Sequence, residues 1–162
     1  MTTKAIQFTI ETYASSIELN SNDAALLDAA RNVTKAAYAP YSNFLVGAVA
    51  DLVSGQQVSG TNQENASYPV GICAERVLLS TISSLFPGAA IKTIAISYHN
   101  LKGQSNHPIS PCGICRQTLV EYQNRTGSPI RLILSGMEGE VIIVESADQL
   151  LPLSFTSIDL LG

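Results

Sequence analysis

The chain has 162 residues, a length that suits one domain with its own hydrophobic core. Hydrophobic residues make up 46% of it and charged residues 14%, which leaves little polar area to cover a monomer and therefore predicts subunit contacts. The formal net charge of -4 argues against a nucleic-acid partner, because binding to phosphates depends on lysine and arginine.

Nothing in the sequence indicates export or membrane insertion. The N-terminal residues mix charged and apolar side chains and contain no apolar run of signal-peptide length. No segment approaches the roughly 20 apolar residues that a membrane-spanning helix requires. We therefore expect a cytoplasmic protein with no membrane partner. Because no repeat or linker interrupts the chain, we expect one domain over 1–162, with 1–20 as an N-terminal arm or edge strand and 146–162 as a C-terminal segment.

The chain is expected to begin with an edge segment followed by a helix. Residues 5–13 alternate in a pattern that could add an edge strand or wrap around a neighbouring subunit. Residues 22–38 place apolar side chains at helical spacing, with Ser21 or Asn22 as the candidate N-cap and Pro40 as the terminator. This helix is the first regular element that the sequence predicts.

Strands and helices then alternate to the end of the chain. Ser54 and Gly55 form the expected turn of a hairpin, and a polar loop at 99–108 is the one long irregular segment. The other expected elements are strands at 44–53, 56–60, 91–97, 130–136 and 140–146 and helices at about 72–86 and 111–124. This order predicts an α/β fold, with a single mixed β-sheet of about five strands, helices on both faces, and parallel pairing where a helix intervenes.

Three cysteines carry the most specific chemical signal. Cys112 and Cys115 fall in the first turn of the third predicted helix, where Ser110 suits the N-cap and Pro111 the first helical position. Cys73 begins the preceding helix. All three therefore lie where unpaired N–H groups and the positive end of the helix dipole favour thiolate over thiol. Taken alone, two cysteines at this spacing are explained as well by core packing or a redox role as by metal binding.

Together, the three cysteines predict a catalytic zinc site. Three thiolates suit tetrahedral zinc and leave the fourth position for water, whereas structural sites usually have four protein ligands. His99 and His107 are the remaining candidates for a fourth ligand, but both lie in or beside the polar loop, where a histidine is more often solvated. We therefore expect one zinc ion per subunit on the three cysteines.

Two residues that follow Cys73 have the chemistry to support this site. Arg76 could hydrogen-bond sulfur and draw negative charge off the metal, although an ordinary surface arginine would explain it too. Glu75 shares an apolar helix face, where a carboxylate requires a partner or a function. Partial burial would raise its pKa toward the range useful for proton transfer. On a regular helix Glu75 lies about 200° from Cys73, so both reach one metal ion only if it sits beyond the helix end.

Two short blocks resemble the zinc-binding signature of the cytidine deaminase family. They are CAER at 73–76 and PCGICRQ at 111–117. The segments YSNFLVGA at 41–48 and NQENASY at 62–68 are similar to two further blocks of that family. The resemblance therefore extends from about residue 21 to Phe155.

The resemblance implies a hydrolytic deaminase that acts on cytidine or deoxycytidine in pyrimidine salvage. Glu75 would carry protons between water, the pyrimidine ring and the leaving amine. Arg76 and Pro111 would support the metal site from behind the cysteines. The all-cysteine site is similar to that of the small homotetrameric branch of the family, in which active sites borrow residues from neighbouring subunits. A homotetramer is therefore expected.

The resemblance also implies the contacts to the substrate. Phe44 would pack against the pyrimidine ring, Asn62 and Glu64 would hydrogen-bond the ribose hydroxyls, and Ala74 would lie beside the substrate. Phe155 would help to close a site. On their own, Phe44 is most simply a core aromatic, Asn62 and Glu64 are turn residues, and Phe155 belongs to a terminal packing segment.

Two other interpretations stay open. A deaminase with the same chemistry could act on another nucleoside-like molecule, for instance a blasticidin-type antibiotic, because enzymes of that kind carry closely similar blocks. The cysteines could instead form a structural zinc site in a non-catalytic binding module, although the missing fourth ligand and Glu75 argue against it. The chain departs from the family in its N-terminal arm, in the loop 99–108 and at 69–71, where substrate preference could change.

Overall fold

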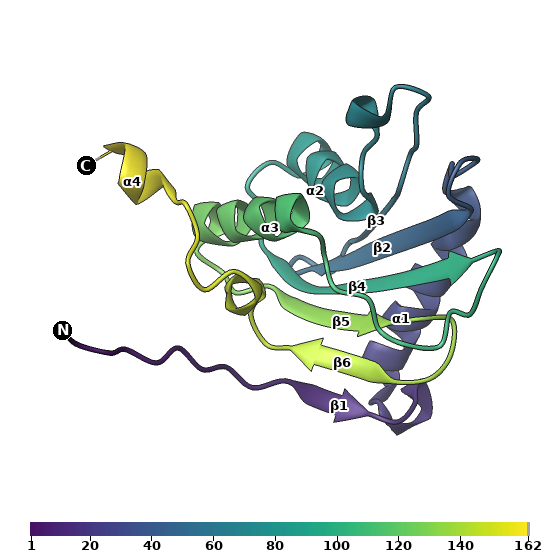
Figure 1. The fold of residues 1–162 in the computed structure, drawn as a ribbon, viewed down its shortest axis with the longest axis horizontal. Coiled ribbons are helices and arrows are strands. Elements are labelled where there is room, and N and C mark those ends of the chain that lie inside the picture. The colour runs from purple at the N-terminus through teal and green to yellow at the C-terminus, as the bar shows by residue number, and fades with distance from the viewer. Residues whose placement is uncertain (162) are drawn as a thin grey trace.

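Strands of one mixed sheet follow the order β1-β6-β5-β4-β2-β3 in the computed structural model, which describes residues 1–161 (Figure 1). The strands are β1 (Glu11–Tyr13), β2 (Phe44–Leu52), β3 (Gln57–Thr61), β4 (Ile91–Asn100), β5 (Arg131–Ser135) and β6 (Val141–Val144). The helices are α1 (Ser21–Val33), α2 (Ala74–Leu85), α3 (Gly113–Thr126) and α4 (Ser157–Leu161), with 3-10 turns η1 (Ser16–Glu18), η2 (Thr34–Ala36), η3 (Tyr68–Val70) and η4 (Ala147–Leu150). The predicted α/β fold is confirmed, with β1 as a sixth strand.

Helix α1 differs from the prediction at both ends. Its N-cap is Asn20, whose side chain accepts hydrogen bonds from two backbone N–H groups of the first turn, so the predicted caps Ser21 and Asn22 are wrong. The α-helix ends at Val33, and a 3-10 turn follows it. The Thr34 hydroxyl bonds back to the carbonyl three residues earlier, a side-chain contact that competes with helix continuation.

The two helical crossovers explain where the site forms. Helix α2 leads from β3 to β4, passing β2, and α3 leads from β4 to its parallel neighbour β5. Both crossovers move in the same direction across the sheet, so the right-handed rule places both helices on the same face. Since β2 is antiparallel to β3 and β4, those two strands run the same way. The beginnings of α2 and α3 therefore lie near each other, beyond the C-terminal ends of β3 and β4.

Each face of the sheet has its own hydrophobic core. Figure 1 shows α2 and α3 on one face and α1 on the other. Buried residues of the first core include Leu78, Ile96 and Leu119, and those of the second include Leu27, Ala30 and Ile133. Helix α2 lies very close to β3, because a Cβ at Gly60 would stand 2.4 Å from the Leu78 backbone nitrogen.

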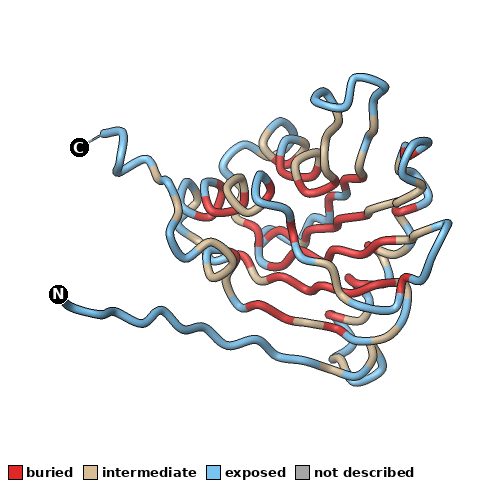
Figure 2. The backbone as a smooth tube through the Cα atoms, in the orientation of Figure 1, coloured by how far each residue is buried: buried red, intermediate tan, exposed pale blue. Residues whose placement is uncertain are grey.

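The N-terminal segment forms the sheet edge only in part. β1 pairs antiparallel with β6, whereas residues 1–10 are exposed and outside any strand (Figure 2). The predicted edge strand is therefore confirmed for its last three residues. In the interior of the sheet, β4 continues to Asn100, because this residue still pairs with Phe44, and so it shortens the predicted loop. None of the helices within residues 1–161 is long and apolar enough to cross a membrane.

Candidate active site

The candidate site lies where α2 and α3 begin. Cys73 is the N-cap of α2 and Cys112 is the N-cap of α3, both with extended backbone angles, and Cys115 lies in the first turn of α3. The sequence placed Ser110 at the cap and Pro111 inside the helix, and that assignment is wrong by two residues. The correction matters because an N-cap side chain projects past the helix end, toward the neighbouring helix start.

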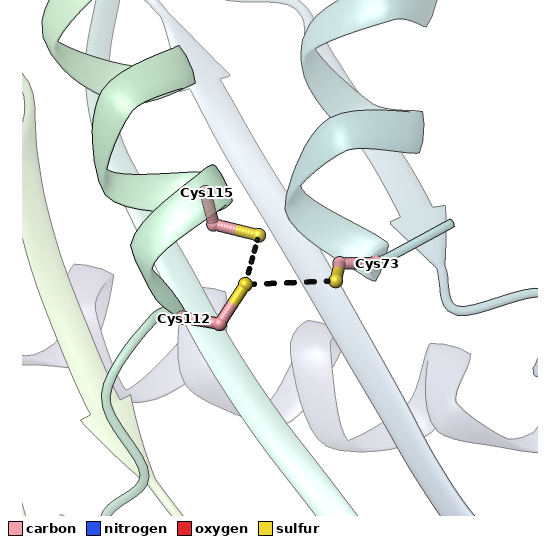
Figure 3. A group of neighbouring side chains, drawn as sticks. All are labelled: Cys73, Cys112 and Cys115. Carbon is pink, nitrogen blue, oxygen red and sulfur yellow. Dashed lines mark hydrogen bonds between the residues drawn. The ribbon is translucent and has the colours of Figure 1, made fainter. Parts of the chain in front are cut away.

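The three sulfur atoms converge on one point (Figure 3). Cys73 Sγ lies 3.8 Å from Cys112 Sγ, which lies 3.4 Å from Cys115 Sγ, and all three are within 4.8 Å of one another. Zinc binds sulfur at about 2.3 Å, so a tetrahedral site separates two thiolates by roughly 3.8 Å. The spacing and the soft donor set therefore fit a zinc ion, and they join two segments that are far apart in sequence.

The thiols perturb one another strongly. Contact with Cys115 lowers the pKa of the Cys73 thiol to about 6, against the opposing effect of burial. The same contact raises the pKa of Cys115, which is fully buried. Because thiolates and not thiols bind zinc, a metal that binds at this cluster releases protons from it.

Glu75 lies at the second position of α2 and is only 6% exposed. Burial raises the pKa of its carboxyl, and contacts with its own backbone N–H and with Cys115 oppose that shift. Within residues 1–161, no ion pair compensates its charge. The conflict that helical geometry predicted does not arise, because Cys73 is the N-cap and stands outside the helix. Both side chains consequently line the same cavity.

This cavity has a volume of about 320 Å³, within the range of small-molecule sites. Six of its lining residues come from the predicted site, namely Asn62, Glu64, Cys73, Ala74, Glu75 and Cys112. Phe44 and Phe155 are not among the lining residues. Val46 lies two residues after Phe44 on β2, so both side chains face the same side of the sheet, and Val46 lines the cavity instead.

The side chains of Asn62 and Glu64 form hydrogen bonds to backbone atoms at the rim of the cavity. The Asn62 amide accepts a hydrogen bond from Val46 N at 2.7 Å and donates one to Phe44 O at 2.9 Å. Glu64 accepts from Tyr41 N at 2.9 Å, and bonding to Ser42 is the main cause of its lowered pKa. The two residues therefore support the loop as turn residues would, while facing the cavity that a substrate would enter.

The two arginines nearest the cysteines in sequence, Arg76 and Arg116, make different contacts. Within residues 1–161, Arg76 forms no hydrogen bond to sulfur, and its charge makes only a minor contribution to the lowered pKa of Cys73, after the Cys115 contact. Arg116 was given no role. Its guanidinium donates to Pro111 O at 2.8 Å and Leu150 O at 3.0 Å, and thereby fixes the turn before Cys112 and Cys115. Its place directly after that pair was the available signal.

The two histidines stay away from the sulfur atoms. The one group of metal-ligating side chains within residues 1–161 consists of the three cysteines. His107 contacts the Tyr98 hydroxyl at 3.1 Å, and His99 lies on β4. Neither histidine supplies a fourth ligand.

Residues 20–127 match the family described as the cytidine and deoxycytidylate deaminase zinc-binding region. The chain belongs to this family. A cytidine deaminase of Halalkalibacterium halodurans is 31% identical over 135 residues, which cover 83% of this chain and 95% of that protein. A cytidine deaminase of Mycoplasma genitalium is 40% identical over 94 residues, covering 57% and 67%.

Solved structures of the family have the same fold. The crystal structure of a cytidine deaminase from Burkholderia pseudomallei is 37% identical, has a TM-score of 0.71, and is matched over 85% of this chain and 100% of that one. The predicted family, fold and zinc cofactor are thus confirmed. The match leaves part of this chain without a counterpart.

Proposed function

We propose that the protein hydrolyses cytidine and deoxycytidine to uridine and deoxyuridine, with release of ammonia. The observation that carries this proposal is the grouping of three converging sulfurs and a buried carboxylate on one cavity of about 320 Å³. Family membership and relatives named as cytidine deaminases supply the substrate class. Pyrimidine salvage is the metabolic role that follows from this reaction.

The residues of the site divide the chemistry among them. Zinc on Cys73, Cys112 and Cys115 would supply a Lewis acid that lowers the pKa of water in its open position. Glu75 would take a proton from that water, because burial raises its carboxyl pKa and so allows it to hold the proton. It would then pass protons to ring nitrogen N3 and to the amino group. The water oxygen becomes the carbonyl at C4, and ammonia leaves.

Substrate positioning is proposed for the rim of the cavity. Asn62 and Glu64 each retain acceptor capacity beyond the backbone contacts that they make, which suits the ribose hydroxyls. Ala74 lines the cavity between Cys73 and Glu75, and its small side chain would leave room for a flat ring. Phe44 would meet the pyrimidine at the edge of the cavity. Phe155 is 58% exposed and would close the cavity of a neighbouring subunit.

We also propose a homotetramer with one zinc ion per subunit. Large apolar side chains are exposed near the cavity and in the C-terminal segment, including Tyr41, Tyr68, Val70, Leu153 and Phe155. Light scattering of the zinc-loaded protein tests the mass. The free thiols fit a reducing compartment such as the cytoplasm, and the net charge of -4 argues against a nucleic-acid partner.

One experiment tests the function and its rivals together. Zinc content and turnover are measured on the same purified sample, with cytidine, deoxycytidine, cytosine and a blasticidin-type antibiotic as substrates and ultraviolet absorbance as the readout. We expect one zinc per chain and turnover of both nucleosides. Turnover of the antibiotic alone would replace the substrate assignment, and stoichiometric zinc without any turnover would favour a structural zinc site.

A further inference from the structure

A histidine outside the metal cluster ties the loop before α3 to the sheet. His107 Nδ1 lies 3.1 Å from the hydroxyl of Tyr98, and the two rings meet edge to face with centroids 5.7 Å apart. Tyr98 is 1% exposed, so its hydroxyl depends on this contact for a partner. His107 itself is exposed, and it lies in the loop that the sequence predicts at 99–108.

The loop has a second anchor close by. The Ser105 hydroxyl accepts a hydrogen bond from Asn100 N at 2.8 Å, and its carbonyl accepts one from Glu138 N at 3.2 Å. The loop also passes very close to Gly136, where a Cβ would stand 2.1 Å from Ser105 O. The segment that leads to His107 is therefore seated on the β5–β6 turn.

The residues just after His107 form a wall of the cavity. Ile109 and Ser110, two and three residues further on, both line it. The guanidinium of Arg116, on α3, donates hydrogen bonds to Ser110 Oγ at 3.0 Å and to Pro111 O at 2.8 Å. His107 and Arg116 thus bracket the short stretch that forms this wall of the cavity.

The contact also reaches the opposite wall through Tyr98. The Tyr98 ring stacks on Phe44, with centroids 4.7 Å apart and planes 14° from parallel. Tyr98 pairs across the strands with Val46, which lines the cavity. Asn62, also in the lining, donates to the Phe44 carbonyl. One aromatic ring therefore joins the β2 wall to the loop wall.

We propose that His107 is a positioning residue for substrate binding. Through its bond to Tyr98 it sets the separation of the two cavity walls, without contacting substrate or metal. This inference rests on the proposed function, because its readout is the turnover of cytidine. Loss of one hydrogen bond should raise KM about three- to tenfold, while kcat and zinc content stay as in the wild type.

The test uses four variants. They are His107→Ala, Tyr98→Phe, the double variant that combines these two substitutions, and His107→Asn, whose amide can occupy the place of Nδ1. The two single variants should each show the raised KM, the double variant no further increase, and the asparagine variant a KM near that of the wild type. His99→Ala is the matched control, because alternate residues of a strand face opposite sides and His99 points away from this cavity.

An unchanged KM in both single variants would overturn the proposal, as would additive effects in the double variant. A fall in kcat alone, or a loss of zinc in His107→Ala, would also overturn it, because His107 would then act at the reacting centre. These outcomes require an active wild type. A wild-type protein that fails to deaminate cytidine instead refutes the proposed function.

Discussion

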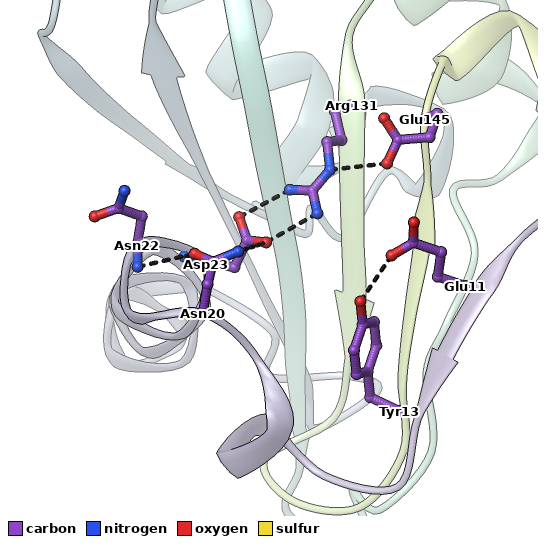
Figure 4. A network of polar contacts seen from close by, with 7 residues as sticks. All are labelled: Glu11, Tyr13, Asn20, Asn22, Asp23, Arg131 and Glu145. Atoms are coloured by element: carbon purple, nitrogen blue, oxygen red, sulfur yellow. Dashed lines mark hydrogen bonds and ion pairs between the residues drawn. The ribbon is translucent and has the colours of Figure 1, made fainter.

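Two polar clusters lie on opposite faces of the sheet and differ in how their charges are paired. On the α1 face, the guanidinium of Arg131 binds both carboxylate oxygens of Asp23 at 2.8 Å and reaches Glu145 at 3.1 Å (Figure 4). On the other face, the three thiols crowd together beside Glu75, which no cation pairs within residues 1–161. Burial is similar, since Asp23 is 8% exposed and Glu75 is 6% exposed.

This contrast in charge pairing indicates a separate role for each cluster. A buried carboxylate that is paired with arginine has a structural role, because removal of either partner leaves an uncompensated charge in the interior. A buried carboxylate without such a partner has its pKa raised and can exchange protons, which is typical of functional sites. We therefore expect substitutions in the thiol cluster to abolish chemistry and substitutions in the ion-pair network to lower stability.

The greatest loss is expected for Cys112→Ala. Removing one of three thiolates should release zinc and abolish turnover, because two sulfurs cannot hold the ion in a catalytic geometry. Metal analysis after dialysis is the measurement. Ile114→Ala is the matched control: this side chain is 63% exposed in the same helical turn and should leave zinc in place. Undiminished zinc in the cysteine variant would contradict the proposed ligand set.

Glu75→Gln should separate metal binding from chemistry. The amide has nearly the same shape but cannot take up a proton, so zinc should remain stoichiometric while kcat falls by about 10²- to 10⁴-fold. Steady-state kinetics and metal analysis of one sample provide the measurement. Glu121→Gln, on the exposed surface of α3, is the control. Wild-type kcat in the Glu75 variant would remove this carboxylate from the mechanism.

Most of the thiol cluster and the burial of Glu75 could be predicted from the sequence. Helix periodicity and N-terminal signals placed Cys73, Cys112 and Cys115 at two helix starts, and the right-handed crossover rule explains why those starts meet. Apolar neighbours along the helix predicted the burial of Glu75. These inferences depend on local patterns in the sequence and on one topological rule, which needs only the order of the strands and helices.

The parts that could not be predicted depend on contacts between distant segments. Asp23 and Arg131 are 108 residues apart, and neither has a local pattern that indicates its partner. Arg116 also acts on a distant segment, through the Leu150 carbonyl. The stacking of Phe44 on Tyr98 depends on strand register, which alternation alone does not fix.

Asp23→Asn should lower stability without affecting the site. The variant keeps the size of the side chain but removes the charge from a buried, doubly hydrogen-bonded pair, so the free energy of unfolding should fall by about 2 kcal/mol. Urea unfolding at fixed protein concentration measures this, with zinc content and KM expected to match the wild type. A changed KM with unchanged stability would show that the two faces are coupled.

A still smaller loss of stability is expected for Glu145→Gln, which removes the other carboxylate that contacts the Arg131 guanidinium. Glu145 contacts Arg131 Nε at 3.1 Å, but its side chain is 59% exposed, whereas that of Asp23 is 11% exposed. Water screens the exposed pair, so its loss should lower the free energy of unfolding by only about 0.5 kcal/mol and less at high salt. Comparing the two variants in urea at low and high ionic strength tests whether burial decides the strength of each pair. Equal losses would mean that the network acts as one unit, in which case its stability cannot be divided between a buried and an exposed carboxylate.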